Sequence, residues 1–217
     1  MSNYQNSLVA SLRTQRLMIG IVGLALPWAC RLELWLTTGH SQALASISHY
    51  YFTPATTMFH ACLILLGTFL IVYRGQGKDD QIVSWISGIS CFMILLFPTN
   101  GLVQHPTQVF DTVLPISSWR NTIHYSAAAL LFSCLAYMDI VVFTRSDQPT
   151  ALQSSGKQQR NVLYHFSGLL ILYCLVRIGL HKSPMQGDQF TYWMETIALS
   201  GFGISWLVKG MGSTINQ

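Results

Sequence analysis

Residues 54–73 read P-A-T-T-M-F-H-A-C-L-I-L-L-G-T-F-L-I-V-Y, a run of twenty residues without a charged side chain. A helix needs about 20 mostly apolar residues to cross the hydrocarbon core of a bilayer. Five further runs of this kind lie at residues 16–37, 82–98, 120–143, 161–180 and 190–208. The sequence therefore predicts an all-α fold, a polytopic membrane bundle of six transmembrane helices that forms one domain over residues 1–217.

The composition supports a membrane protein. Hydrophobic residues make up 51% of the chain and charged residues 9%, whereas soluble domains carry about 25% charged residues. No block of lysine or arginine is long enough to indicate nucleic-acid binding. The cysteines all lie inside apolar runs, so no disulfide framework is predicted.

Basic residues predict how the bundle is oriented. Only Arg120 and Lys182 fall in loops on one side of a six-span arrangement. The other side collects Arg13, Arg16, Arg74, Lys78, Arg145, Lys157, Arg160 and Lys209. Because cytoplasmic loops carry the excess of basic residues, both termini are predicted to be cytoplasmic, in a multi-pass protein of the cytoplasmic (inner) membrane. Residues 144–160, rich in Ser, Gln and Thr, are expected to form a cytoplasmic linker.

Local signals predict helix ends and helix contacts. Thr53 and Pro54 suit the N-cap and first position of the second helix, and the last helix is expected to begin near Asp188. Small residues allow helices to approach closely in lipid. Two such stripes are Ser84, Ser87, Gly88 and Cys91 on the third run, and Ser200, Gly201, Gly203 and Ser205 on the sixth.

Ionisable residues gather at the outer ends of the predicted spans, with Asp139 as the exception near an inner end. At 1.5 Å per residue, the group lies within roughly 10 Å of the outer interface. Ionisable groups in a bilayer are costly and usually pair, face the bundle interior or serve a function. They predict one outward-facing polar pocket, formed by Arg31, Glu33, His60, His124, Arg177 and Glu195, with Ser48 and Tyr50 at its rim. An arginine would neutralise a glutamate there.

The leading hypothesis is that this pocket binds a lipid headgroup or a small polar ligand of the outer leaflet and could modify it. An arginine would suit a phosphate on that ligand. Membrane lipids are the expected partners, with a protein partner or a second copy of the chain as further candidates. Nucleophilic catalysis could use Ser46 or Ser48 with a nearby histidine, His49 or His60.

Two other classes of function stay open. In the first, His60 and His124 bind a metal, either one haem b as its axial pair or a zinc ion. In the second, the protein is a structural or assembly subunit whose charges only hold helices together. The residues taken singly fit the structural class as well, because Arg31 and Glu33 lie close enough to a helix end to reach water.

Several motifs resemble a family of bacterial membrane proteins without an established activity. They are Ser46-Ile47-Ser48-His49-Tyr50-Tyr51, Phe59, Gly67, Tyr73-Arg74-Gly75, Phe97-Pro98-Thr99, Tyr192-Trp193-Met194-Glu195 and Phe202 to Gly210. The resemblance covers most of the chain and implies a six-span protein.

A fainter similarity to Frag/DRAM/Sfk-type membrane proteins implies a link to lipid remodelling and membrane organisation. More remotely, the chain is similar to ceramidase-type lipid hydrolases, which use Ser, Asp and three His around zinc. It carries Glu195 where they have paired histidines, and this difference argues against zinc-dependent hydrolysis.

Overall fold

The structure is a computed structural model that describes residues 2–75, 77–100, 109–112, 114–146, 154–181 and 188–212. All regular elements in these ranges are helical, so the all-α prediction is confirmed. They are α1 (Ser2–Thr38), the short 3₁₀ helix η1 (Ile47–Phe52), α2 (Thr56–Val72), α3 (Lys78–Leu96), α4 (Ser118–Tyr137), the π-helical turn η2 (Met138–Val142), α5 (Ser155–Leu180) and α6 (Phe190–Gly212).

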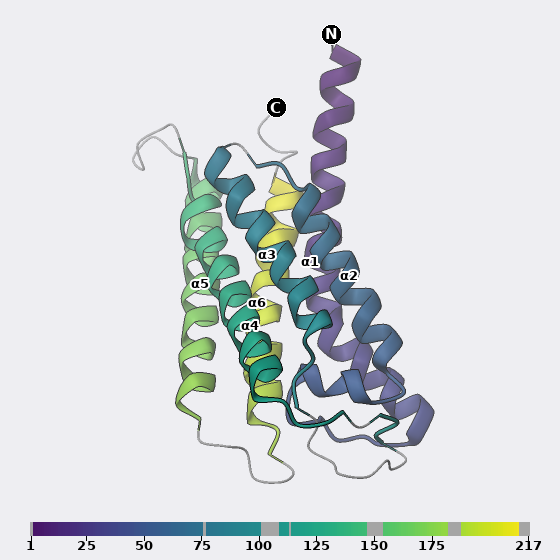
Figure 1. Cartoon of the computed structure of the whole chain (residues 1–217). Coiled ribbons are helices and arrows are strands. Elements are labelled where there is room, and N and C mark those ends of the chain that lie inside the picture. Colours follow the sequence, from purple (N-terminus) through teal and green to yellow (C-terminus); the bar gives the residue numbers. More distant parts are fainter. Residues whose placement is uncertain are drawn as a thin grey trace.

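The long helices run up and down as a bundle (Figure 1). Each packs against the next helix along the chain, and α6 returns to pack against α1. The start of α1 and the end of α6 lie at the same end of the bundle, and η1 lies at the opposite end (Figure 1). Residues that are far apart in the chain, in η1 and at the start of α6, therefore come together.

Four helical segments are long and apolar enough to cross a membrane: Ala10–Thr38, Lys78–Leu96, Ser118–Val142 and Ser155–Leu180. The apolar run at residues 54–73 forms a shorter apolar helix, Thr56–Val72, of 17 residues. α6 is not in the set of four; polar residues such as Glu195 lower its mean hydropathy. These lengths and compositions fit a membrane protein.

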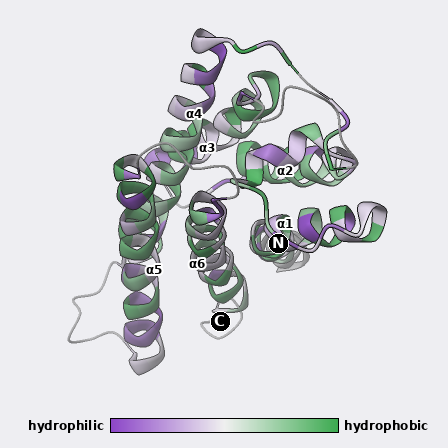
Figure 2. Ribbon diagram, turned by 90° about the horizontal axis from the view of Figure 1, so that it is seen from below, coloured by the Kyte–Doolittle hydropathy of each residue, from purple (hydrophilic) through white to green (hydrophobic). Residues whose placement is uncertain are grey.

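The outer face of the bundle is apolar, and α5 shows this most clearly. Its exposed large side chains recur every three or four positions and so form one stripe: Val162, Phe166, Leu169, Tyr173, Val176 and Leu180. The ribbon coloured by residue hydropathy shows hydrophobic positions along much of the helices (Figure 2). Soluble monomers rarely expose contiguous apolar surfaces of this extent, so this stripe suits contact with lipid chains.

Glycines bring two pairs of helices close together. A Cβ atom on Gly203 of α6 would lie 2.8 Å from the carbonyl oxygen of Gly20 in α1, and a Cβ on Gly20 would lie 2.8 Å from the carbonyl oxygen of Gly203. A Cβ on Gly88 of α3 would lie 2.6 Å from the carbonyl oxygen of Gly67 in α2. The predicted small-residue stripes therefore do mark helix contacts, with Gly88 and Gly203 as their closest points.

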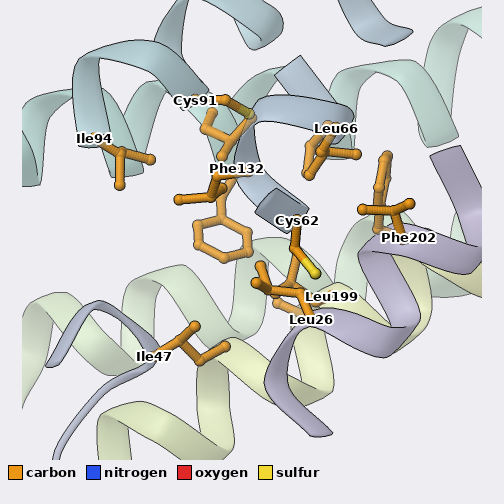
Figure 3. Packing of buried hydrophobic residues seen from close by; sticks show 14 of the residues in the cluster. Leu26, Ile47, Cys62, Leu66, Cys91, Ile94, Phe132, Leu199 and Phe202 are labelled. Atoms are coloured by element: carbon orange, nitrogen blue, oxygen red, sulfur yellow. The ribbon is translucent and has the colours of Figure 1, made fainter. Parts of the chain in front are cut away.

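The buried interior joins the long helices and η1. Leu26, Cys62, Phe132 and Phe202 come from α1, α2, α4 and α6, and Ile47 reaches this cluster from η1 (Figure 3). All five cysteines are free, in agreement with the absence of a predicted disulfide framework.

Several helix ends differ from the prediction. Thr53 ends η1 and does not cap α2, which begins at Thr56; its hydroxyl donates to the Tyr50 carbonyl at 2.9 Å. α5 begins at Ser155, so the last part of the expected linker is helical, because the Ser154 side chain accepts from the backbone N–H of Lys157 at 3.3 Å. Asp188 does cap α6, accepting from the Phe190 N–H at 2.8 Å.

Candidate functional site

The stretch S-I-S-H-Y-Y-F folds back into the end of the bundle as η1. Tyr50 and Phe52 are buried there. Two bonds tie the stretch to α6: the backbone N–H of Tyr192 donates to the carbonyl of Ala45 at 3.1 Å, and the backbone N–H of Ile47 donates to Oε2 of Glu195 at 2.7 Å. These bonds fix its serines and histidine in place.

A cavity of about 440 Å³ lies between this stretch, α4, α5 and the start of α6. Its polar lining consists of Ser46, Ser48, His49, Thr99, His124, His181, Thr191 and Glu195. Its other lining residues are Ala45, Tyr125, Ala128, Ala129, Phe132, Leu175, Ile178 and Gly179. Along α4 the lining changes from His124 to Phe132 over about 12 Å, at 1.5 Å per residue. The cavity is therefore polar at the η1 end and apolar deeper in the bundle.

The cavity is open on the side of the bundle. Tyr125 and Ala129 on α4 and Gly179 on α5 line it and are also exposed on the outer surface. Tyr125 is 59% exposed. The opening therefore lies between α4 and α5, on the apolar flank where lipid chains would lie.

Ser48 and His124 form a hydrogen-bonded pair at the polar end. Nε2 of His124 lies 3.0 Å from Oγ of Ser48, and Nδ1 lies 2.9 Å from the carbonyl oxygen of Phe97. A carbonyl can only accept, so Nδ1 of a neutral His124 carries the proton and Nε2 accepts from the Ser48 hydroxyl. The backbone at the end of α3 thus sets the tautomer of His124.

A second pair lies beside the first. Oγ of Ser46 lies 2.7 Å from Nδ1 of His49, whose Nε2 is buried and has no hydrogen-bond partner among the described residues. Burial lowers the pKa of His49 from 6.5 to about 4, and the nearby His124 contributes in the same direction. His49 is therefore neutral at pH 7, and its side chain forms part of the wall of the cavity.

The structure places three of the eight predicted pocket residues at this cavity: Ser48, His124 and Glu195. Tyr50 does not line it and is fully buried against Tyr192, with the ring centroids 6.0 Å apart.

The other four predicted residues make local contacts or lie away from the cavity. Arg31 donates to the carbonyl of Ser41 at 2.8 Å, and His60 bonds the carbonyl of Thr56 one turn earlier at 2.6 Å. Arg177 is exposed and forms no salt bridge with a carboxylate of the described residues. It donates to the hydroxyl of Tyr173 at 2.9 Å. Glu33 is not a lining residue.

The expected pairing of an arginine with Glu33 or Glu195 is absent among the described residues. The salt bridges there join Arg145 to Asp79 and Asp80, and His181 to Asp188. Asp139, expected apart from the pocket, lies fully buried in η2. His105 and Lys182 lie outside the described residues.

Sequence reasoning left Ser46 and His49 out of the pocket set, although the signal for them was present. Both belong to the polar stretch between two apolar runs, and this stretch as a whole forms one wall of the cavity. His181 was also not in the set. It stacks on Phe190, with ring centroids 4.3 Å apart, and joins the lining from the end of α5.

Metal binding through His60 and His124 stays a sequence prediction. No three His, Cys, Asp or Glu side chains in the described part of the chain gather in a way that would hold a metal ion. Both ring nitrogens of His124 already have hydrogen-bond partners.

Acidification should weaken the fold through His49. Because its folded pKa of about 4 lies below its ordinary 6.5, the unfolded chain takes up a proton first as the pH falls. The contribution of neutral His49 to the free energy of unfolding is present in full above pH 6.5 and is lost progressively as the pH falls toward 4. The loss between pH 7 and pH 5 should be about 2 kcal/mol. Thermal unfolding in detergent at the two pH values would measure it, and His49→Gln should show a smaller drop. Equal drops in both proteins would contradict the assignment.

Comparisons with models of known protein families, with curated proteins and with solved structures find no match for this chain.

Proposed function

We propose that the protein is a six-span protein of the cytoplasmic membrane that binds a lipid in the cavity beside η1. All six long helices cross the bilayer, both termini are cytoplasmic, and the cavity lies in the outer leaflet. The distribution of basic residues and the common end of α1 and α6 support this orientation. The apolar outer face of α5 supports its contact with lipid chains.

One observation carries the choice of ligand: the cavity is polar at one end, apolar at the other and open on the lipid-facing flank. A small water-soluble ligand would leave the apolar half unused. A lipid matches both halves, with its polar group near His49, His124 and Glu195 and its chain between α4 and α5. The hydroxyl and imidazole groups suit a headgroup that accepts and donates hydrogen bonds, or an ester, which accepts them.

Filling the cavity should reduce lipid binding. A Cβ on Gly179 meets nothing within 4 Å, so Gly179→Leu adds its side chain at the opening without a clash at Cβ. Native mass spectrometry of protein purified in mild detergent should show the retained lipid reduced about tenfold, a loss of about 1.4 kcal/mol in binding.

The matched control is Gly156→Leu. Gly156 also lies exposed on α5 but outside the cavity lining. Both changes raise helix propensity by a similar amount. The two variants therefore differ in whether the new leucine side chain fills the cavity. Retention of lipid at the wild-type level by the Gly179 variant would contradict the proposed function.

A further inference from the structure

The polar end of the cavity contains a hydrogen-bonded serine–histidine pair, which the binding of a headgroup alone does not require. A serine nucleophile needs a base within hydrogen-bond distance and a third group that orients the base. Ser48 and His124 are 3.0 Å apart, and the Phe97 carbonyl accepts from the far side of the same imidazole at 2.9 Å. His124 is therefore held in the tautomer that accepts the Ser48 proton.

We propose that Ser48 is the nucleophile of an ester-cleaving site, with His124 as its general base and the Phe97 carbonyl as the group that orients this base. The inference rests on the proposed function, because the substrate is the lipid that occupies the cavity. The substrate class is a carboxylic ester of a long-chain acid or alcohol, since apolar side chains such as Phe132 and Leu175 line the depth beyond the serine.

The reaction proceeds in two balanced steps. Oγ of Ser48 forms a bond to the carbonyl carbon while its proton passes to Nε2 of His124. The C–O bond to the alcohol then breaks, and the alcohol leaves with that proton. Water then attacks the carbonyl carbon of the acyl-serine and gives a proton to Nε2 of His124. The bond between that carbon and Oγ of Ser48 breaks, and Oγ takes the proton back from His124. The products are the alcohol and the carboxylic acid.

The second pair, Ser46 with His49, is the less suitable nucleophile. Ser46 is buried, whereas Ser48 is partly exposed to the cavity. His49 also lacks an orienting group on its other nitrogen among the described residues. Ser48 is therefore the better placed of the two serines for attack on a substrate in the cavity.

An alkyl fluorophosphonate, which phosphonylates activated serines, is the probe. Full-length protein in mild detergent should gain one adduct by intact-mass measurement, located on Ser48 by peptide mapping. Ser48→Ala should abolish the adduct, whereas Ser133→Ala, at an exposed serine of α4 outside the cavity lining, should retain it. His124→Gln should slow labelling about 100-fold or more, as expected for loss of a general base.

Absence of an adduct on the wild-type protein, or an adduct that persists in Ser48→Ala, would overturn the proposal. Ser48→Cys guards against misfolding, because it keeps a side chain of similar size. It should lose fluorophosphonate labelling and gain labelling by maleimide. Native mass spectra of the same samples separate the two proposals. Lipid retained without labelling would support the binding site and contradict the nucleophile at Ser48. Labelling without retained lipid would support the nucleophile and contradict the lipid-binding site.

Discussion

The Gly203→Ala variant is expected to lose about 3 kcal/mol of its unfolding free energy, the upper part of the range for overpacking in a well-packed interior. The new Cβ would lie 2.8 Å from the Gly20 carbonyl oxygen and about as close to Leu24 of α1. Two of the three nearest atoms are backbone, which no side-chain rotation can move. α1 and α6 would have to separate, and they form the most extensive helix pair among the described elements.

The control is Gly179→Ala, the same chemical change in another helix. Nothing lies within 4 Å of a Cβ at Gly179, and replacing glycine by alanine in a helix stabilises it by about 1 kcal/mol. The two variants should therefore move the unfolding midpoint in opposite directions when titrated with denaturing detergent. If both variants shift in the same direction, the close approach of α1 and α6 at Gly203 is wrong.

The Glu195→Ala variant should release η1 and lower lipid binding about tenfold, which corresponds to about 1.4 kcal/mol. Oε2 of Glu195 accepts from the Ile47 N–H at 2.7 Å, and a hydrogen bond of this kind contributes about 0.5–1.5 kcal/mol. Alanine leaves that N–H without its partner in a partly buried position. Amide hydrogen exchange in peptides covering residues 45–52 should become faster, and native mass spectrometry should show less retained lipid.

Glu33→Ala is the matched control. Sequence analysis expected both glutamates in one pocket, but Glu33 does not line the cavity and has no salt bridge among the described residues. Its removal should leave exchange at residues 45–52 and lipid retention unchanged. A Glu33 variant that loses lipid as strongly as the Glu195 variant would show that general charge, and not the bond to Ile47, supports the site.

The sequence predicted the helices well because burial in lipid demands long apolar runs. It located the start of α6 through the capping residue Asp188. It missed that α5 begins near Ser155, because the first turns of this helix are polar and do not contribute to an apolar run.

The site was predicted only in part because apolar runs give the depth of a residue but not its rotation about the helix axis. His60 and His124 were expected at matched depth, yet His60 turns back to its own helix while His124 reaches across to Phe97 and Ser48. Arg31 was expected to face a carboxylate and instead bonds the backbone of the loop that follows it. Contacts such as Glu195 to Ile47 join distant parts of the chain and leave no local pattern.

The side opening between α4 and α5 has a consequence for how occupancy should be measured. A bilayer component that enters there never crosses water, so its relevant abundance is its mole fraction in the leaflet and not its aqueous concentration. Even modest intrinsic affinity then keeps the cavity filled in the native membrane. Detergent dilutes that component and competes for the same entrance, so occupancy should fall as the detergent-to-lipid ratio rises during purification.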